Sequence, residues 1–336
     1  MSRRSPAAAV RVACVAFLGV TACGRADTVS QAATSPTSPP LAERGALAPR
    51  DAGPREPGLL RFVAIGDTGR GDAAQARVAD ALAKKCAVSG CDFVQLLGDN
   101  IYTSGVTSTT DPQWQSHFER PYAKVDLPFW VVLGNHDYGG GGLGNESDKA
   151  GHQVEYSRVS AKWRLPARFW RRVENDVELV GLDTNAAVYR QAAAQRAEVD
   201  AWLTSSKATW RLAFGHHPYK SNGPHGDAGS YDPGKNNGLD GGRGFKEFFD
   251  GAVCGKVDVY FAGHDHSIQV LQPDCGGTAL VVSGAGAEAT TLPGSNPTYH
   301  QTLALGFVWV EVRGRSLRLE VVDETGATRF ERALTK

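Results

Sequence analysis

The sequence predicts an α/β fold, with a two-layer β core sandwiched by helices, in a single domain at residues 59–336. After Gly58, apolar runs of strand length alternate with helix-like segments, which is typical of an α/β sheet. The last apolar runs follow one another without helices between them, so we expect a second layer of strands there.

The expected elements form two series. In the first, apolar runs predict strands at 60–65, 93–97 and 129–133, while the segments AAQARVADALAKK and WQSHFERPY predict helices at 73–85 and near 114–122. In the second, the apolar run at 177–182 predicts a strand, and a long helical stretch at 189–206 follows it. The remaining elements are strands at 210–214, 257–262, 279–286, 306–312 and 317–323.

The composition indicates a globular protein with a sizeable core, since 41% of the 336 residues are hydrophobic and 21% are charged. Lys and Arg together number 36, as do Asp and Glu, so the chain has no basic excess. We therefore expect no nucleic acid partner held by charge.

Residues 1–22 have the pattern of a signal peptide. Three arginines precede an apolar run at 12–20 that is too short to span a bilayer. The run ends in Val-Thr-Ala-Cys, which resembles the bacterial lipobox, so we expect a lipoprotein whose mature chain begins at an acylated Cys23. Ordinary cleavage after Ala22 is the alternative, and Arg3 and Arg4 leave both the Sec and the twin-arginine export routes open.

Residues 23–58 are rich in Ala, Ser, Thr and Pro and predict a disordered tether. The sequence thus predicts an exported protein in the cell envelope, at the outer membrane or in the periplasm. Its contact with the membrane would be the lipid on Cys23, and we expect a monomer.

Four cysteines remain beyond the signal peptide and Cys23, and an even number in an exported chain favours disulfides. We prefer the pairs Cys86 with Cys91 and Cys254 with Cys275, because each closes a short loop. Four cysteines allow three connectivities, so the choice stays open. A zinc site is the alternative, although none of the four has the two-residue spacing of a zinc knuckle.

Polar residues that bind metals follow the ends of five apolar runs, each after a glycine. Ligands bind outside the carboxyl ends of strands in open α/β folds, and glycine lets the chain turn sharply there. Each motif alone is an ordinary turn, but together they gather five of the nine histidines near strand ends. The blocks are Gly66-Asp67-Thr68-Gly69, Gly98-Asp99-Asn100-Ile101-Tyr102, Gly134-Asn135-His136-Asp137, Gly215-His216-His217-Pro218 and Gly263-His264-Asp265-His266.

This donor set is too large for one ion and suits two adjacent hard or borderline cations. A phenolate favours a trivalent ion such as Fe³⁺, so Tyr102 distinguishes one site from the other. With Fe³⁺ and a divalent ion, Asp67, Asp99 and ionised Tyr102 leave a positive balance that a phosphate dianion fits.

The five blocks resemble the calcineurin-like metallophosphoesterases, and more closely the purple acid phosphatases of the small, tartrate-resistant type. The resemblance extends to YSRVSAKWRLPARFW, VELVGLDT, SGAGA and GFVWVEV, and it covers nearly all of residues 60–330. It implies the four-layer metallophosphoesterase fold and two metal ions, Fe³⁺ plus Fe²⁺, Zn²⁺ or Mn²⁺. The implied ligands are Asp67, Asp99, Tyr102 and His266 for the ferric ion, and Asn135, His216 and His264, with Asp99 as a bridge, for the second.

The resemblance also implies hydrolysis of a phosphate ester by a hydroxide held at the two metals. His136 and His225 would contact the phosphate and protonate the leaving group. Asp137 would either orient His136 or be a solvated loop residue. Two departures from the family, His217 where tyrosine is common and Pro224 where an acidic residue can occur, concern proton transfer and substrate preference.

The function expected is that of an exported acid phosphatase acting on phosphate monoesters. A phosphodiesterase or nucleotide hydrolase on the same metal centre is the alternative, because only the rim of the site selects the substrate. A non-catalytic metal-binding lipoprotein would keep the ligands without needing a free His136.

Overall fold

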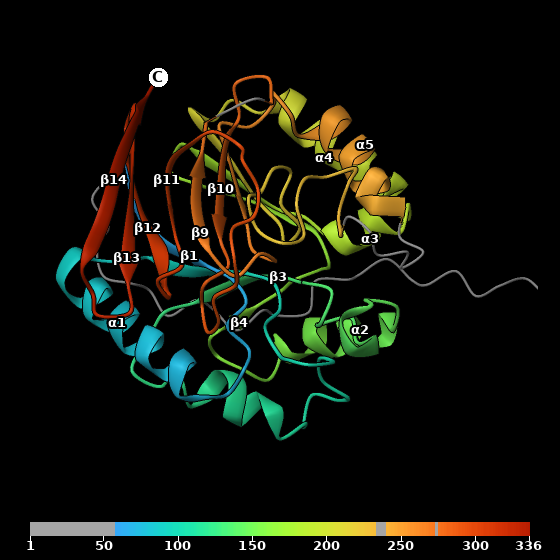
Figure 1. Ribbon diagram of the computed structural model, residues 1–336, viewed down its shortest axis with the longest axis vertical. Coiled ribbons are helices and arrows are strands. Elements are labelled where there is room, and N and C mark those ends of the chain that lie inside the picture. Colours follow the sequence, from blue (N-terminus) through green and yellow to red (C-terminus); the bar gives the residue numbers. More distant parts are fainter. Residues whose placement is uncertain (1–57, 233–239, 273–274) are drawn as a thin grey trace, which may run out of the picture. The chain divides into compact units, whose positions relative to one another are not determined.

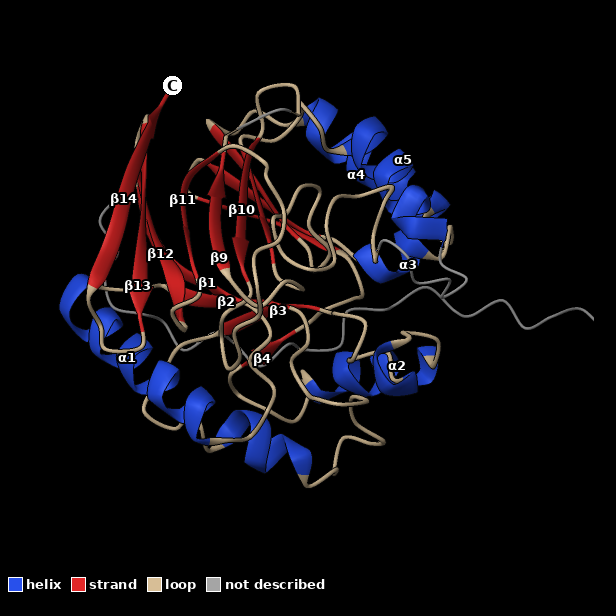
Figure 2. Ribbon diagram, in the orientation of Figure 1, coloured by secondary structure: helices blue, strands red, loops and turns tan. Residues whose placement is uncertain are grey.

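The structure is a computed structural model and describes residues 58–232, 240–272 and 275–336. The predicted signal peptide, Cys23 and nearly all of the predicted tether lie outside the described residues, so these assignments and the domain boundaries stay predictions. In the described part, two β-sheets lie between two groups of helices, as Figure 1 and Figure 2 show. This confirms the predicted fold class.

The first sheet has seven strands in the order β14-β13-β12-β1-β2-β3-β4. Strands β1 to β4 run parallel, whereas β12, β13 and β14 form an antiparallel meander that joins the sheet through β1. The bounds are β14 (Thr328–Thr335), β13 (Ser316–Asp323), β12 (Gly306–Arg313), β1 (Leu59–Ile65), β2 (Phe93–Leu97), β3 (Phe129–Val132) and β4 (Trp163–Arg164).

The second sheet also has seven strands, in the order β11-β9-β10-β8-β7-β6-β5. Its centre, β6 to β8 and β10, is parallel, and β5, β9 and β11 pair antiparallel at the sides. The bounds are β11 (Thr298–Thr302), β9 (Ile268–Leu271), β10 (Ala279–Ser283), β8 (Val259–Ala262), β7 (Trp210–Phe214), β6 (Val177–Gly181) and β5 (Trp170–Glu174).

The helices cover the outer faces of the sheets (Figure 1). Helix α1 begins after Asp72, whose carboxylate accepts hydrogen bonds from two backbone N–H groups of the first turn. The helices on the side of the first sheet are α1 (Ala73–Ser89), the π-helix η1 (Trp114–Glu119) and α2 (Ser147–Tyr156). Those on the second are α3 (Thr184–Val188), α4 (Ala193–Ser205) and α5 (Arg243–Ala252), and the 3₁₀ turns are η2 (Gly140–Gly142) and η3 (Asp240–Gly242).

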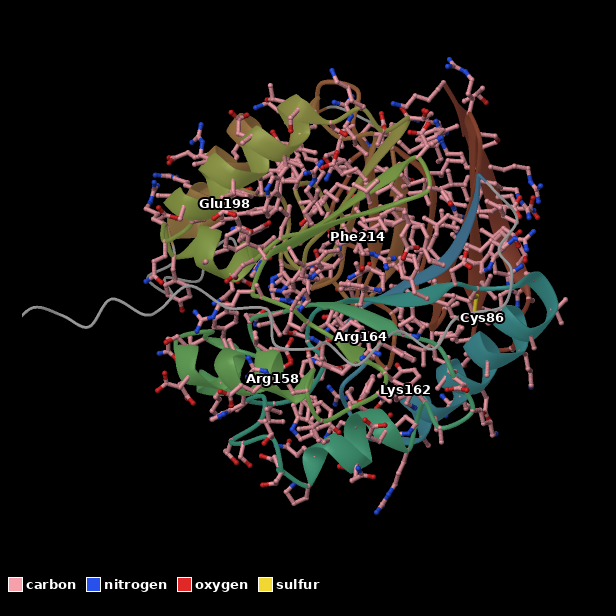
Figure 3. The ribbon with its side chains drawn as sticks, turned by 180° about the vertical axis from the view of Figure 1, so that it is seen from behind. Cys86, Arg158, Lys162, Arg164, Glu198 and Phe214 are labelled. Atoms are coloured by element: carbon pink, nitrogen blue, oxygen red, sulfur yellow. A yellow bond between two sulfur atoms is a disulfide. The ribbon has the colours of Figure 1, made fainter. Side chains whose placement is uncertain are left out.

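The core between the sheets is built on aromatic rings from facing strands. Phe62 of β1 meets Phe214 of β7 and Phe261 of β8 edge to face, with ring centroids 5.8 and 5.9 Å apart. All three are fully buried, and Phe214 lies in the middle of the side chains in Figure 3. This packing holds β1 opposite β7 and β8, and so brings the ends of strands from both sheets together.

The helix expected at 189–206 begins later, at Ala193. A short helix, α3, precedes it, and the chain between the two turns at Arg190, whose φ of 58° is left-handed. The apolar pattern of the sequence also does not predict α2, α5 or the five strands β4, β5, β9, β11 and β14. These strands lack a continuous apolar run because several are short or exposed on one face: β14 alternates exposed and half-buried residues.

Two disulfides join the four remaining cysteines as preferred, Cys86 to Cys91 and Cys254 to Cys275. The first links the end of α1, where Figure 3 labels Cys86, to the loop before β2. Their presence accords with an oxidising compartment. Within residues 58–232, 240–272 and 275–336, no helix combines the length and apolar character needed to cross a membrane.

Candidate metal centre

The predicted metal ligands follow parallel strands of both sheets. Strands β1, β2 and β3 of the first sheet and β7 and β8 of the second end just before the five blocks. Because the strands within each set are parallel, their carboxyl ends lie at one edge of the sheet. The facing sheets bring the two edges together, and all nine predicted site residues meet there.

The backbone is left-handed at three predicted ligands. Asp67, Asp99 and His264 have φ angles of 58°, 51° and 72°, and each directly follows a glycine. Residues other than glycine rarely adopt such angles, which cluster at functional sites. The left-handed residue reverses the chain as it leaves the strand and turns the side chain inward.

A first cluster of donors is formed by Asp67, Tyr102 and His266. The Tyr102 hydroxyl donates a hydrogen bond to Asp67 Oδ1 at 3.1 Å and lies 3.1 Å from His266 Nε2. His266 Nε2 is 3.5 Å from the same Asp67 oxygen. A carboxylate, a phenol and an imidazole therefore converge on one small volume.

A second cluster is formed by Asn135, His216 and His264. His216 Nε2 lies 2.8 Å from Asn135 Oδ1 and 3.1 Å from His264 Nδ1. Asp99 connects the two clusters: its Oδ1 is 3.5 Å from His216 Nε2, and Asp67, Asp99 and His216 have ligand atoms within 4.8 Å of one another.

The hydrogen bonds of the second cluster fit a cation between its members. His216 Nδ1 lies 3.0 Å from the Leu97 carbonyl. A carbonyl oxygen only accepts hydrogen bonds, so Nδ1 carries a hydrogen and donates it to Leu97. His216 Nε2 faces the Asn135 oxygen, and the two atoms can share a metal ion as its ligands. Holding a histidine by its other nitrogen, as the Leu97 carbonyl holds His216, is the usual arrangement of a metal-binding histidine.

The pKa shifts of the first cluster also fit a bound cation. Burial and the carboxylates of Asp67 and Asp99 raise the pKa of Tyr102 well above its ordinary value. Burial lowers the pKa of His266, but Asp67, Asp99 and Glu288 outweigh it and raise this pKa to about 9. Two acidic groups thus hold protons where a metal ion would supply the positive charge instead.

His264 and His217 have pKa values well below the ordinary value of histidine. Burial is the main cause for both, followed by neighbouring histidines. Both rings are therefore neutral, the form in which imidazole binds metals. His217 is held by Thr184, whose Oγ1 lies 2.9 Å from His217 Nδ1 and accepts the backbone N–H groups of His216 and His217.

His136 stands beside the clusters rather than in them. Its backbone N–H donates to Asp99 Oδ1 at 2.9 Å, and its Nδ1 lies 2.6 Å from the Thr103 carbonyl. Nε2 is 4.0 Å from Asp99 Oδ2, and the side chain is 24% exposed. The ring is thus fixed at one nitrogen and open to solvent at the edge of the site.

His225 reaches the site from the loop after β7. Its ring centroid is 4.1 Å from that of His264, and its Nδ1 lies 2.9 Å from Asp232 Oδ1. Asp232 and Thr184 are not predicted from the sequence, because a single carboxylate or hydroxyl outside a motif gives no signal. Only the folded chain shows that each fixes one nitrogen of a histidine.

Both expectations for Asp137 are wrong. Its carboxylate is fully buried and accepts N–H groups from Gly134, Asn100, Ile101 and Gln153, with no bond to His136. It joins the loop that carries Asp99 to the loop that carries Asn135. Burial and the nearby Asp99 raise the pKa of Asp137 to about 6.

A cavity of about 100 Å³ opens beside the second cluster. Its lining includes three histidines and Asn135 as well as the apolar side chains of Leu143 and Val188 and the ring of Tyr231. The structure thus joins a cluster of metal-binding side chains to space for a small organic group.

Residues 60–267 match the family model of the calcineurin-like phosphoesterases. This match spans more than half of the chain and all seven predicted metal ligands. The chain belongs to the calcineurin-like phosphoesterase family. It is a hydrolase that cleaves phosphate esters, and the family implies a centre of two metal ions.

Two groups of curated relatives resemble this phosphoesterase over most of its length. Tartrate-resistant acid phosphatase type 5 of Sus scrofa is 28% identical over 83% of this chain and 87% of its own, and that of Homo sapiens is 27% identical over 82% and 91%. Purple acid phosphatase 17 of Arabidopsis thaliana is 29% identical over 69% and 70%.

Solved structures support the fold. A structure described as "GAP50 the anchor in the inner membrane complex of Plasmodium" has a TM-score of 0.65 at 20% identity and covers 82% of this chain and 89% of its own. A dimetal phosphatase of Danio rerio has a TM-score of 0.52 at 13% identity, over 83% and 99%.

Proposed function

We propose that this phosphoesterase is an exported acid phosphatase that hydrolyses phosphate monoesters. The observation that supports this most directly is the pair of donor clusters joined by Asp99, one with a phenol and one without. A centre with two unlike sites accounts for that difference.

In the first site, Asp67, Tyr102, His266 and Asp99 would hold Fe³⁺, since a phenolate prefers a trivalent ion. In the second, Asn135, His216, His264 and Asp99 would hold Fe²⁺, Zn²⁺ or Mn²⁺. When bound, the ions supply Lewis acidity, which makes water a nucleophile near neutral pH and stabilises charge on the phosphoryl oxygens.

The histidines at the edge supply the protons and the orientation. The Thr103 carbonyl holds Nδ1 of His136, so Nε2 of the protonated ring is left to donate a proton to the departing oxygen. Asp232 lies 2.9 Å from Nδ1 of His225 and orients this ring beside His264, where His225 would contact a phosphoryl oxygen.

The cavity beside the centre favours monoesters. At about 100 Å³ it has room for one compact organic group against Leu143, Val188 and Tyr231. A diester brings two such groups, and the second would need its own place at the rim.

The test compares phenyl phosphate with bis(4-nitrophenyl) phosphate, using purified protein loaded with iron and zinc. We expect phosphate release from the monoester with a much higher kcat/KM than hydrolysis of the diester. A preference for the diester would make the protein a phosphodiesterase. No hydrolysis of either ester, with two ions bound, would make it a non-catalytic metal-binding protein.

Export and anchoring are tested separately. We propose that Cys23 carries lipid and begins a mature monomer of 314 residues, anchored in the envelope. Mass spectrometry of the membrane fraction should find the acylated peptide, and Cys23→Ala should move the protein to the soluble fraction. An unmodified N-terminus at another residue in the wild type would contradict the anchor and leave the enzyme activity unaffected.

A further inference from the structure

A second cavity, of about 260 Å³, lies between the two sheets, away from the metal centre. Its lining includes Trp210, Asp258 and Ala279, at or near the starts of β7, β8 and β10. The metal ligands follow the opposite ends of β7 and β8. A five-residue strand rises about 16 Å, so the cavity is well separated from the reaction site.

The cavity opens between two edge strands. Strand β14 ends the first sheet and β11 ends the second, at the side of the molecule where both are drawn in Figure 1. Near the cavity, Phe330 of β14 stacks on His300 of β11 with ring centroids 4.9 Å apart. Tyr299 of β11 and Arg332 and Leu334 of β14 line the cavity beside this contact.

The floor of the cavity is apolar. Val270, Leu271, Val281 and Leu319 line it, and each is at most 2% exposed. An engineered apolar cavity of about 150 Å³ takes up benzene, with six carbon atoms, so about 260 Å³ has room for about ten non-hydrogen atoms.

The mouth carries a cation without an acidic partner. Residues 330, 332 and 334 are the half-buried face of β14, so Arg332 lies on the same side as two apolar side chains. Its guanidinium carbon is 3.4 Å from the centre of the Tyr299 ring, and among the described residues no carboxylate pairs with it. Lys336, also at the mouth, is instead paired with Asp258 at 2.7 Å.

The Arg332 guanidinium stacks on the Tyr299 ring by its face, and its N–H groups point outward in the plane of the guanidinium. A carboxylate can accept hydrogen bonds from two of these N–H groups at once. We propose that this cavity binds a medium-chain carboxylate, with the hydrocarbon chain on the apolar floor and the carboxylate on Arg332. Octanoate, with ten non-hydrogen atoms, matches the volume. This site does not depend on the function proposed above.

The test is calorimetric titration of the purified full-length protein with octanoate in the presence of saturating inorganic phosphate. We expect one octanoate per chain, and affinity that falls about fourfold for each methylene removed towards butanoate. Absence of binding at millimolar octanoate would overturn the proposal. So would binding that is seen without phosphate and lost in its presence, because octanoate would then occupy the metal centre.

Two variants separate the head of the site from its floor. Arg332→Gln should weaken octanoate binding about tenfold or more and leave binding of octan-1-ol unchanged, because the alcohol has no charge. The matched control is Arg329→Gln, which removes a charge from the exposed face of the same strand. Ala279→Leu should fill the cavity and abolish binding of both ligands, while hydrolysis of phenyl phosphate stays at the wild-type rate.

The outcomes against the proposal are distinct. Inward charges on edge strands also prevent association between sheets. If Arg332→Gln binds octanoate normally but self-associates in light scattering, Arg332 protects an edge and no carboxylate site exists. Equal weakening of octanoate and octanol would equally remove the role of Arg332 as the anion contact.

Discussion

Replacement of His136 by alanine tests the assignment of the proton donor. The contact of His136 with Asp99 is made by the backbone N–H, at 2.9 Å, so alanine keeps it. The side chain is 24% exposed, and water can fill the space it leaves. We therefore expect His136→Ala to fold and to bind two metal ions as the wild type does.

The loss of activity should depend on the leaving group. A positioned proton donor contributes about 10²- to 10⁴-fold, or about 3 to 5 kcal/mol of transition-state stabilisation. An alkyl phosphate leaves as a strongly basic alkoxide and needs the proton. A nitrophenolate is a weak base and needs it far less, so 4-nitrophenyl phosphate should lose much less kcat/KM than an alkyl phosphate.

The assay measures kcat/KM for both esters together with the metal content of each variant. His152→Ala, which removes a half-buried histidine on α2 outside the centre, is the matched control and should behave as the wild type. Equal losses for the two esters with both metals retained would refute proton donation and make His136 a phosphate-binding residue. Loss of a metal ion would make it a ligand or a structural residue.

Four further predictions concern the centre and the stability of the fold. Tyr102→Phe should remove the visible absorption band of the iron-loaded protein while both ions stay bound. In the wild type, the apparent affinity for iron should fall as the pH falls, because His266, with a pKa of about 9, must lose its proton to bind the ion. Burial raises the pKa of Glu320, but Lys85, Thr328 and Arg318 outweigh it and lower this pKa on balance. Glu320→Gln should therefore reduce the free energy of unfolding, measured in urea, by about 2 kcal/mol at pH 7. The difference between variant and wild type should vanish as the pH falls below about 4, where Glu320 becomes protonated. Replacing Cys254 and Cys275 by serine should reduce the free energy of unfolding by about 3 kcal/mol, and replacing Cys86 and Cys91 should reduce it by about 2 kcal/mol. The difference arises because the Cys254–Cys275 bond spans 21 residues and the Cys86–Cys91 bond spans 5.

The part of the fold that the sequence predicts is the part with continuous apolar runs. Strands such as β1 and β2 are almost wholly buried, so their residues are apolar at every position but one, Arg61 in β1 and Gln95 in β2. Strand β11 has no such run, because its residues alternate between half-buried and exposed. Its position beside β9 follows from pairing between residues far apart in the chain, which a local pattern does not contain.

The candidate ligands were predictable because each follows a strand and a glycine within one short motif. The residues that fix them were not. Asp137 belongs to such a motif, yet its neighbours in space are Asn100 and Gln153, on other loops and helices. The sequence therefore suggested a role beside His136, whereas the fold uses the carboxylate to join two loops.

Hydrogen bonds within the chain itself hold the candidate ligands in place. Asp67 Oδ2 accepts the backbone N–H of His264 at 2.8 Å, and Asp99 Oδ1 accepts that of His136 at 2.9 Å, so each carboxylate fastens a loop from a different strand. These approaches require glycine nearby: a Cβ at Gly263 would lie 2.6 Å from Asp67 Oδ2, and one at Gly134 would lie 2.2 Å from Asp99 Oδ1. The glycine before each ligand thus lets the carboxylates reach across to the neighbouring loop as well as letting the chain turn. The left-handed backbone at Asp67 and Asp99 is held by these same bonds, which is why its strain persists in the folded protein.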